Sequence, residues 1–111
     1  MTALVTGSSG HLGEALVREL RGRGERVRGL DLQPAPGTDL VASVTDREAL
    51  RAALAGVETV FHTATLHKPH VATHEKQAFV DTNVSGTLAV LEEAVRAGVR
   101  RVIFTSTTSA F

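Results

Sequence analysis

Apolar residues alternate along the chain between short continuous runs and positions spaced three or four residues apart. The short runs predict five strands, and the helix-spaced positions between them predict helices. The predicted strands are residues 3–5, 26–31, 39–44, 56–62 and 99–104. The predicted helices are residues 12–21, 45–54 and 74–98. Strands that alternate with helices in this way predict an α/β fold with a parallel sheet.

Glycines and one aspartate mark the ends of the predicted helices. Asp46 is a better N-cap of the second helix than the neighbouring Thr45, because its carboxylate can accept a hydrogen bond from a free backbone N–H group. Gly22 and Gly24 stop the first helix. Gly98 closes the last helix, at the position where a left-handed residue commonly ends a helix.

Three glycines lie between the first predicted strand and the first predicted helix, at G-x-x-G-x-x-G spacing. Gly7 would allow a tight turn, Gly10 would let a phosphate approach the backbone, and Gly13 would let the helix pack close to the strand. The free N–H groups at the start of the helix would then face the diphosphate of a dinucleotide. The alternative is a chance glycine loop.

Asp31 ends the second predicted strand. An acidic residue at this place can accept both ribose hydroxyls of an adenosine, and it would repel the 2′-phosphate of NADP, so Asp31 favours NAD. Arg26 and Arg28 lie on the same strand and weaken this preference, because either could neutralise a phosphate. The alternative reading of Asp31 is a solvated aspartate in a turn.

The composition excludes several classes of binding partner and site. The chain has 111 residues, a length that fits one domain, and its 12 basic and 12 acidic residues give no electrostatic reason to expect a nucleic acid or an anionic membrane. The absence of cysteine removes disulfides, thiol nucleophiles and thiolate metal sites. No apolar run approaches the roughly 18 residues of a membrane-spanning helix, and residues 1–10 read as a strand and loop instead of a signal peptide. A soluble, cytoplasmic protein is expected.

Four segments together resemble the extended short-chain dehydrogenase/reductase superfamily, in its epimerase/dehydratase branch. They are the glycine turn, Asp31, the Asn-Val-Ser-Gly-Thr run that starts at Asn83, and the hydroxyl-rich run after Phe104. The resemblance implies a Rossmann-like, doubly wound parallel sheet with strand order 3-2-1-4-5 in three layers. It also implies a bound nicotinamide dinucleotide, NAD more than NADP, and hydride transfer on a sugar nucleotide or related polyhydroxy substrate.

The resemblance implies roles for individual residues. Phe104 aligns with the aromatic residue that precedes the hydroxyl run in the family. This alignment makes Thr107, within an error of one residue, the catalytic residue whose hydroxyl bonds the substrate at its reacting carbon. Asn83 would belong to the active-site framework near the nicotinamide, and Ser43 stands where the family has an aspartate near the adenine. The expected cofactor-binding residues are Gly7, Ser9, Gly10, His11, Leu12, Gly13, Asp31, Leu32, Ser43, Val44, Thr63, Ala64, Thr65, His67, Asn83, Thr105 and Ser106.

The histidines predict no metal site. His62 is expected to be a packed, hydrogen-bonded side chain at a strand end. His70 and His74 are four residues apart, but Pro69 interrupts this stretch and no carboxylate stands at matching spacing. His67 is expected near the phosphates or the nicotinamide.

The chain contains no tyrosine. In the family a Tyr-x-x-x-Lys pair downstream of the hydroxyl run takes the proton from the substrate hydroxyl. Residues 1–111 are therefore expected to be the dinucleotide-binding part of a longer enzyme, inactive by themselves, and family resemblance adds the expectation of a homodimer. The alternatives are a non-catalytic module that senses the redox state of nicotinamide and an α/β domain without a ligand.

Overall fold

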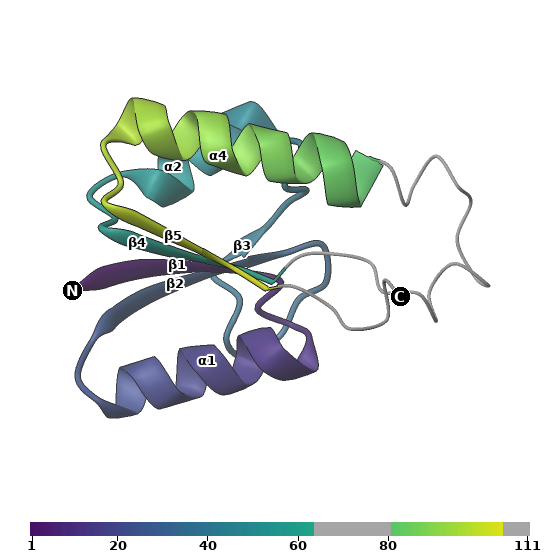
Figure 1. The fold of residues 1–111 in the computed structure, drawn as a ribbon. Helices are drawn as coiled ribbons and strands as arrows, with labels where there is room; N and C mark the ends of the chain where they lie inside the picture. The colour runs from purple at the N-terminus through teal and green to yellow at the C-terminus, as the bar shows by residue number, and fades with distance from the viewer. Residues whose placement is uncertain (64–80, 106–111) are drawn as a thin grey trace.

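The computed structural model describes residues 1–63 and 81–105, which form three layers (Figure 1). A sheet lies in the middle, α1 (His11–Gly22) covers one of its faces, and α2 (Arg47–Leu54) and α4 (Gly86–Ala97) cover the other. A short π-helical segment, η2 (Asp81–Ser85), leads directly into α4. The predicted α/β fold and its three layers are confirmed.

The sheet has five strands in the order β3-β2-β1-β4-β5, and all neighbouring strands are parallel. Their bounds are β1 Thr2–Thr6, β2 Arg26–Asp31, β3 Leu40–Val41, β4 Thr59–His62 and β5 Arg101–Phe104. This order confirms the prediction. Doubly wound sheets bind ligands at the carboxyl ends of the strands where the order reverses, which here are β1 and β4.

The third strand is shorter than predicted. β3 contains only two residues, whereas the apolar pattern predicted a strand over residues 39–44. β3 pairs only with β2, through Leu30 with Leu40 and Asp31 with Val41, and β2 ends at Asp31. Residues 42–44 therefore extend past the end of the partner strand. Val44 turns instead into the core, where it is 6% exposed.

The predicted helix over residues 74–98 is only partly α-helical. Residues 74–80 lie outside the described residues, and residues 81–85 form the π-helix η2, so the described α-helix starts at Gly86. A π-turn closes wider hydrogen-bonded rings than an α-helix, and a run of apolar residues at helical spacing does not reveal it. The end is as predicted: Gly98 has a φ of 76°, and its N–H donates to the Val95 carbonyl.

The central strand is buried from both sides. Ala3, Leu4 and Val5 of β1 have no exposed surface, because helices cover both faces of the sheet. The apolar cluster that joins the sheet to α2 and α4 consists of Leu4, Leu30, Val44, Leu50, Ala53, Leu54, Val57, Val60, Ala89 and Val90. Burial of each large aliphatic side chain contributes about 1.5–3 kcal/mol. The carboxyl ends of the strands therefore project from a rigid support.

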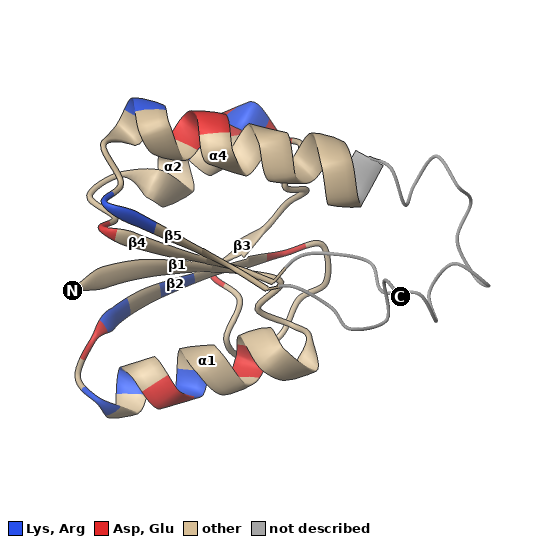
Figure 2. Cartoon of the chain, in the orientation of Figure 1, with Lys and Arg blue, Asp and Glu red and all other residues tan. Residues whose placement is uncertain are grey.

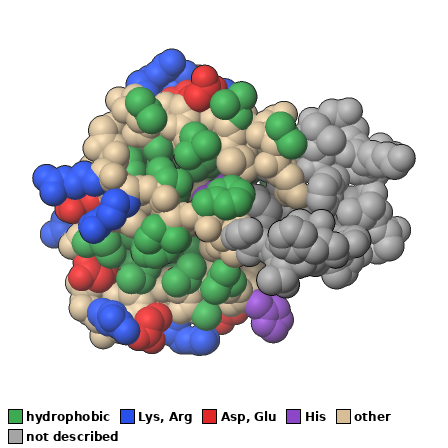
Figure 3. Space-filling model, in the orientation of Figure 1, with side chains coloured by type: hydrophobic (Ala, Val, Ile, Leu, Met, Phe, Trp, Pro, Cys, Tyr) green, Lys and Arg blue, Asp and Glu red, His purple; other side chains and the backbone are tan. Residues whose placement is uncertain are grey.

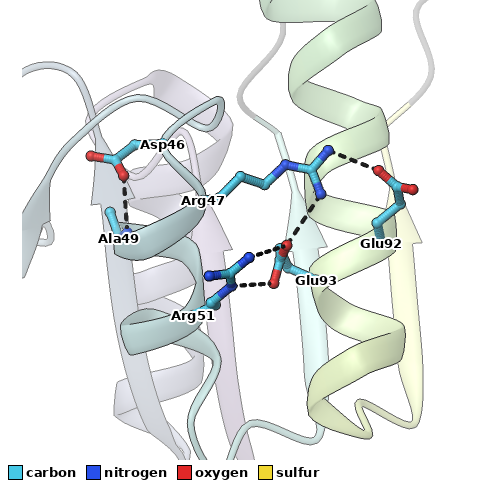
Figure 4. A network of polar contacts seen from close by, with 6 residues as sticks. All are labelled: Asp46, Arg47, Ala49, Arg51, Glu92 and Glu93. Carbon is cyan, nitrogen blue, oxygen red and sulfur yellow. Dashed lines mark hydrogen bonds and ion pairs between the residues drawn. The ribbon is translucent and has the colours of Figure 1, made fainter.

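A buried carboxylate ties α4 to α2 (Figure 4). Glu93 of α4 is 1% exposed and accepts hydrogen bonds from Arg51 Nε at 2.9 Å and Arg47 Nη1 at 3.1 Å. Arg47 also donates to the half-exposed Glu92 at 2.8 Å. The Arg51 hydrogen bond, with that of Arg47, holds the pKa of Glu93 below its usual range against the effect of desolvation. Elsewhere acidic and basic residues are interspersed along α1 (Figure 2).

Two glycines bring other segments close to the first turn. At Gly13, in the first turn of α1, a Cβ would lie 1.9 Å from the carbonyl oxygen of Gly7. At Gly29, in β2, a Cβ would lie 1.9 Å from the carbonyl oxygen of Gly37 and 2.7 Å from Ser8 Oγ. Backbone fills both places, so neither accepts a side chain. The close packing predicted for Gly13 is confirmed, whereas no sequence signal singled out Gly29.

Apolar side chains of α4 and β5 face outward. β5 lies at an edge of the sheet, with Ile103 48% and Phe104 50% exposed. On α4, Leu88, Leu91 and Val95 are also exposed, at a spacing that puts them on one side of the helix. Figure 3 shows hydrophobic side chains spread over the face that carries β5.

Gly13→Ala should destabilise the protein by at least about 2 kcal/mol, because the new methyl group overlaps backbone atoms that cannot move independently. Gly22→Ala is the matched control in the same helix, since a Cβ there meets nothing within 4 Å. It should be neutral or stabilising by up to about 1 kcal/mol. Urea unfolding of the two variants checks this, and equal stabilities would contradict the close contact.

Glu93→Gln should lower the stability at neutral pH more than Glu92→Gln does, because only the Glu93 carboxylate is buried between two guanidinium groups. Its pKa is lowered in the folded state, so its stabilising effect is full above the pKa of the unfolded chain and is lost as the pH falls through the folded pKa. The gap between the two variants should therefore close in acid. Denaturant unfolding over a pH series measures it, and a gap independent of pH would refute the assignment.

Candidate functional site

The turn between β1 and α1 presents backbone N–H groups at the carboxyl end of β1. Gly7 has a φ of 75°, in the left-handed region that favours glycine, and its N–H donates to the Leu30 carbonyl at 2.8 Å. α1 begins without a side-chain cap. Among the described residues, no acceptor lies against the N–H groups of His11, Leu12 and Gly13. Three free donors at the positive end of a helix dipole suit a phosphate group.

Gly10 is a glycine that the fold itself does not require. Its φ of −81° is accessible to any residue, and a Cβ would make an ordinary contact, 3.4 Å from the Gly7 carbonyl oxygen. Neither backbone conformation nor packing therefore excludes a side chain here, in contrast to Gly13. The close approach of a ligand, as the sequence predicted, would account for a glycine at this position.

Asp31 lies beside this turn, at the end of β2. The Ser9 N–H donates to Asp31 Oδ2 at 3.0 Å, and the Gln33 N–H donates to Oδ1 at 2.9 Å. A carboxylate offers about four lone-pair sites, so further donors can still bind it. The side chain is half-buried and held from two sides. The turn and a carboxylate of fixed orientation thus form one surface.

The two arginines of β2 lie away from this carboxylate. Arg26 starts the strand and Asp31 ends it, a span of about 17 Å at the usual rise per residue. Arg28 Nη1 donates to the carbonyls of Ala53 at 2.8 Å and Ala55 at 2.6 Å, at the end of α2. Neither guanidinium is placed to neutralise a charge next to Asp31.

The ends of β4 and β5 reach the same edge of the sheet. Thr63, which follows β4, donates its hydroxyl to the Thr6 carbonyl at 2.6 Å and its N–H to Thr6 Oγ1 at 3.1 Å. Thr105, which follows β5, donates its N–H to the His62 carbonyl at 3.2 Å. The structure therefore aligns Thr63 and Thr105 with the glycine turn.

His62 is a buried link between strands and helix. It is 1% exposed, with Nδ1 2.7 Å from Thr6 Oγ1 of β1 and Nε2 3.1 Å from Thr87 Oγ1 of α4. Burial lowers the pKa of His62 to about 4, so the imidazole is neutral near pH 7. Its ring also packs against Phe104, with centroids 5.6 Å apart. These contacts agree with the packed, hydrogen-bonded histidine that the sequence predicted.

The remaining predicted residues fall into three groups. Leu32 is 61% exposed just after Asp31, and Asn83 is half-buried in η2. Val44 is almost fully buried in the core, which leaves its side chain little surface for a ligand, and the half-buried Ser43 has its hydroxyl 2.7 Å from the Thr45 hydroxyl. Outside the described residues lie Ala64, Thr65, His67, Ser106 and Thr107.

Sequence reasoning missed several residues that shape this edge. Thr38 lies in the loop after β2, and its hydroxyl contacts both Ser8 and Ser9 of the glycine turn. Thr6 and Thr87 hold the two ring nitrogens of His62. Single hydroxyls of this kind leave no periodic signal, because their partners are distant in sequence.

The described part of the chain offers neither a metal-ligand cluster nor a membrane-spanning helix. Residues 1–63 and 81–105 contain no group of three side chains that could hold a metal ion. None of the helices within these ranges is both long enough and apolar enough to span a membrane.

Comparison with known proteins adds three similarities. The model of the NAD dependent epimerase/dehydratase family matches residues 3–111. Sterol demethylase protein B of Methylococcus capsulatus is 42% identical over 99% of this chain, which covers 35% of that relative. The human sterol-4-alpha-carboxylate 3-dehydrogenase, decarboxylating, is 37% identical over 95% of this chain and 28% of its own length.

Among solved structures, MoeE5 in complex with UDP-glucose and NAD superposes with a TM-score of 0.87 at 33% identity. The match covers 98% of this chain and 37% of MoeE5. The chain thus spans about a third of the length of the proteins that it matches.

The His62 contacts predict a pH dependence of stability. Its pKa is about 4 when folded and about 6.5 when unfolded, so below neutral pH the unfolded state takes up a proton that the buried ring does not. The contribution of His62 to stability should fall by about 2 kcal/mol between pH 7 and pH 5. The difference in unfolding free energy between the wild type and His62→Gln should shrink accordingly. The same comparison with His11→Gln, at an exposed histidine, is the control, and an equal pH slope for both would rule out the buried neutral ring.

Proposed function

The chain belongs to the NAD dependent epimerase/dehydratase family, and we propose that residues 1–111 are the dinucleotide-binding domain of an enzyme that transfers a hydride between a substrate carbon and a nicotinamide. The observation that carries this proposal is one surface on which the free N–H groups of the glycine turn lie beside the oriented Asp31 carboxylate. When bound, the nicotinamide cofactor supplies the hydride acceptor.

The residues of the turn fit a diphosphate. The N–H groups of His11, Leu12 and Gly13 would donate to its oxygens, and the absence of a side chain at Gly10 would let the group approach the backbone. No basic side chain is needed, because the helix dipole and the amides provide the positive potential. Thr63 and Thr105, at the ends of the neighbouring strands, would line the part of the site that faces the nicotinamide.

Asp31 supports NAD over NADP in this proposal. Its free lone pairs would accept the two ribose hydroxyls of the adenosine, whereas a 2′-phosphate would meet a negative charge. Arg26 and Arg28, which the sequence offered as partners for that phosphate, lie away from this carboxylate.

Proton transfer is proposed for residues beyond the described site. By family resemblance, Thr107 would bond the reacting hydroxyl, and a Tyr-x-x-x-Lys pair would take its proton. His62 is not a candidate base, because it is buried, neutral and bonded to two hydroxyls. A continuation of the reading frame that contains the pair supports the enzyme, and a stop codon after Phe111 favours the redox sensor.

The substrate proposed for the enzyme is a secondary alcohol. The relatives of highest identity described above carry sterol names, which favours a sterol hydroxyl, and the complex of MoeE5 with UDP-glucose supports the sugar nucleotide that the sequence resemblance implied. Product analysis after incubation of the full-length protein and NAD with a 3-hydroxysterol or with UDP-glucose distinguishes the two; net oxidation of either alcohol also forms NADH, whereas an epimerase or dehydratase returns the hydride to the sugar and forms none. A cytoplasmic homodimer is proposed as well; the exposed residues Leu88, Leu91 and Val95 of α4 offer an apolar contact surface for it.

Asp31→Ala should raise the Kd of the full-length protein for NAD roughly thirtyfold, equivalent to about 2 kcal/mol for hydrogen bonds to a charged group. The Kd for NADP should change much less, so the preference for NAD should shrink. Asp46→Ala removes an aspartate that caps α2 and should leave the ratio of the two Kd values unchanged. Isothermal titration calorimetry measures both ligands; an unchanged ratio in Asp31→Ala would remove Asp31 from the site.

A further inference from the structure

We propose that Thr38 is a positioning residue for the adenosine end of the dinucleotide site, because its hydroxyl joins Ser8 and Ser9 in a chain that orients Asp31. This inference rests on the proposed function, since it concerns how the same site selects its ligand. Thr38 lies in the loop between β2 and β3, outside every sequence motif described above.

The contacts of Thr38 close that loop onto the glycine turn. Thr38 Oγ1 lies 2.6 Å from Ser8 Oγ and 2.8 Å from Ser9 Oγ. Ser8 has no exposed surface, so its hydroxyl depends on protein partners. The loop reaches this position because Gly29 leaves room for the carbonyl of Gly37. The hydroxyl of Thr38 thus contacts two residues of the turn from this loop.

The hydrogen bonds among these hydroxyl groups run in one direction. Ser9 Oγ bonds the carbonyl oxygen of Gln33, which can only accept, so the single hydroxyl proton of Ser9 is used there. Thr38 must then donate to Ser9, and Ser8 must donate to Thr38. The order is Ser8 to Thr38 to Ser9 to the Gln33 carbonyl. Chains in which each hydroxyl both accepts and donates strengthen one another.

This chain of hydrogen bonds ends on the two residues that hold Asp31. Ser9 and Gln33 each donate a backbone N–H to one carboxylate oxygen, and the Ser9 hydroxyl bonds them to each other. Thr38 fixes the rotamer of Ser9 by donating to it. The orientation of the Asp31 carboxylate, and with it the direction of its free lone pairs, therefore depends on a hydroxyl that does not itself contact Asp31.

Loss of the Thr38 hydroxyl should weaken NAD selectively. Thr38→Val keeps the shape of the side chain but leaves Ser8 without its acceptor and Ser9 without its donor. The ribose hydroxyls would then meet a poorly oriented carboxylate, whereas NADP, which gains nothing from Asp31, would be little affected. A general loosening of the turn would instead weaken both ligands equally, because both carry the same diphosphate.

The test compares Thr38→Val, Thr38→Ser and Thr2→Val in the full-length protein by calorimetry with NAD and with NADP. We expect Thr38→Val to raise the Kd for NAD about five- to tenfold and the Kd for NADP less than about twofold. Thr38→Ser, which restores the hydroxyl, should recover the affinity for NAD. Thr2→Val, at the other end of β1, should change neither. Ser9→Ala cuts the same chain and replaces Thr38→Val if that variant does not fold.

A double-mutant cycle separates this role from a local structural one. If Thr38 acts through Asp31, Thr38→Val should not change the Kd for NAD further in an Asp31→Ala background. Additive effects, equal losses for NAD and NADP, or a variant that binds like the wild type would each overturn the inference while the dinucleotide site stands. A wild-type protein that binds neither ligand would instead overturn the proposed function.

Discussion

The structure depends on the contact between the first turn of α1 and the backbone of Gly7. At Gly13 the helix lies so close that a Cβ would overlap the Gly7 carbonyl. This contact sets the direction from which α1 starts, and therefore where its free N–H groups point. With helices on both faces of β1, the sheet below cannot shift to relieve the contact. The proposed phosphate-binding geometry is thus a consequence of backbone packing rather than of any charged side chain.

Hydrogen bonds between distant segments then complete the edge around this turn. Asp31 is held by the turn itself, and His62 joins the end of β1 to α4 through Thr6 and Thr87. Further along, α4 is fixed again, where Glu93 binds two arginines of α2. α4 therefore has one polar anchor near the site and one away from it, with apolar packing between them. The proposed hydride transfer requires such a fixed frame, because the protein must position the cofactor against the reacting carbon.

The sequence predicted the elements that have a strong local pattern. The helix caps at Asp46 and Gly98 and the tight turn at Gly7 were confirmed because each follows from a local residue preference or backbone conformation. The strand order was confirmed too, but the family resemblance had implied it, since no local pattern specifies the order of strands. The sequence overestimated β3, whose length is set by the end of its partner strand, and it missed η2, since a π-turn leaves apolar spacing almost unchanged. Thr38 and Thr87 could not be found in advance, because hydroxyl contacts between distant segments exist only once the chain has folded.

The central claim is that the amides at the start of α1 hold a diphosphate. Amide resonances of the ¹⁵N-labelled full-length protein, followed during titration with NAD, test it most directly. The account predicts that the largest downfield shifts occur at His11, Leu12 and Gly13, whose N–H groups have no acceptor among the described residues, while Gly22 at the other end of α1 stays unchanged. Binding of NAD with no change at these three amides would contradict it.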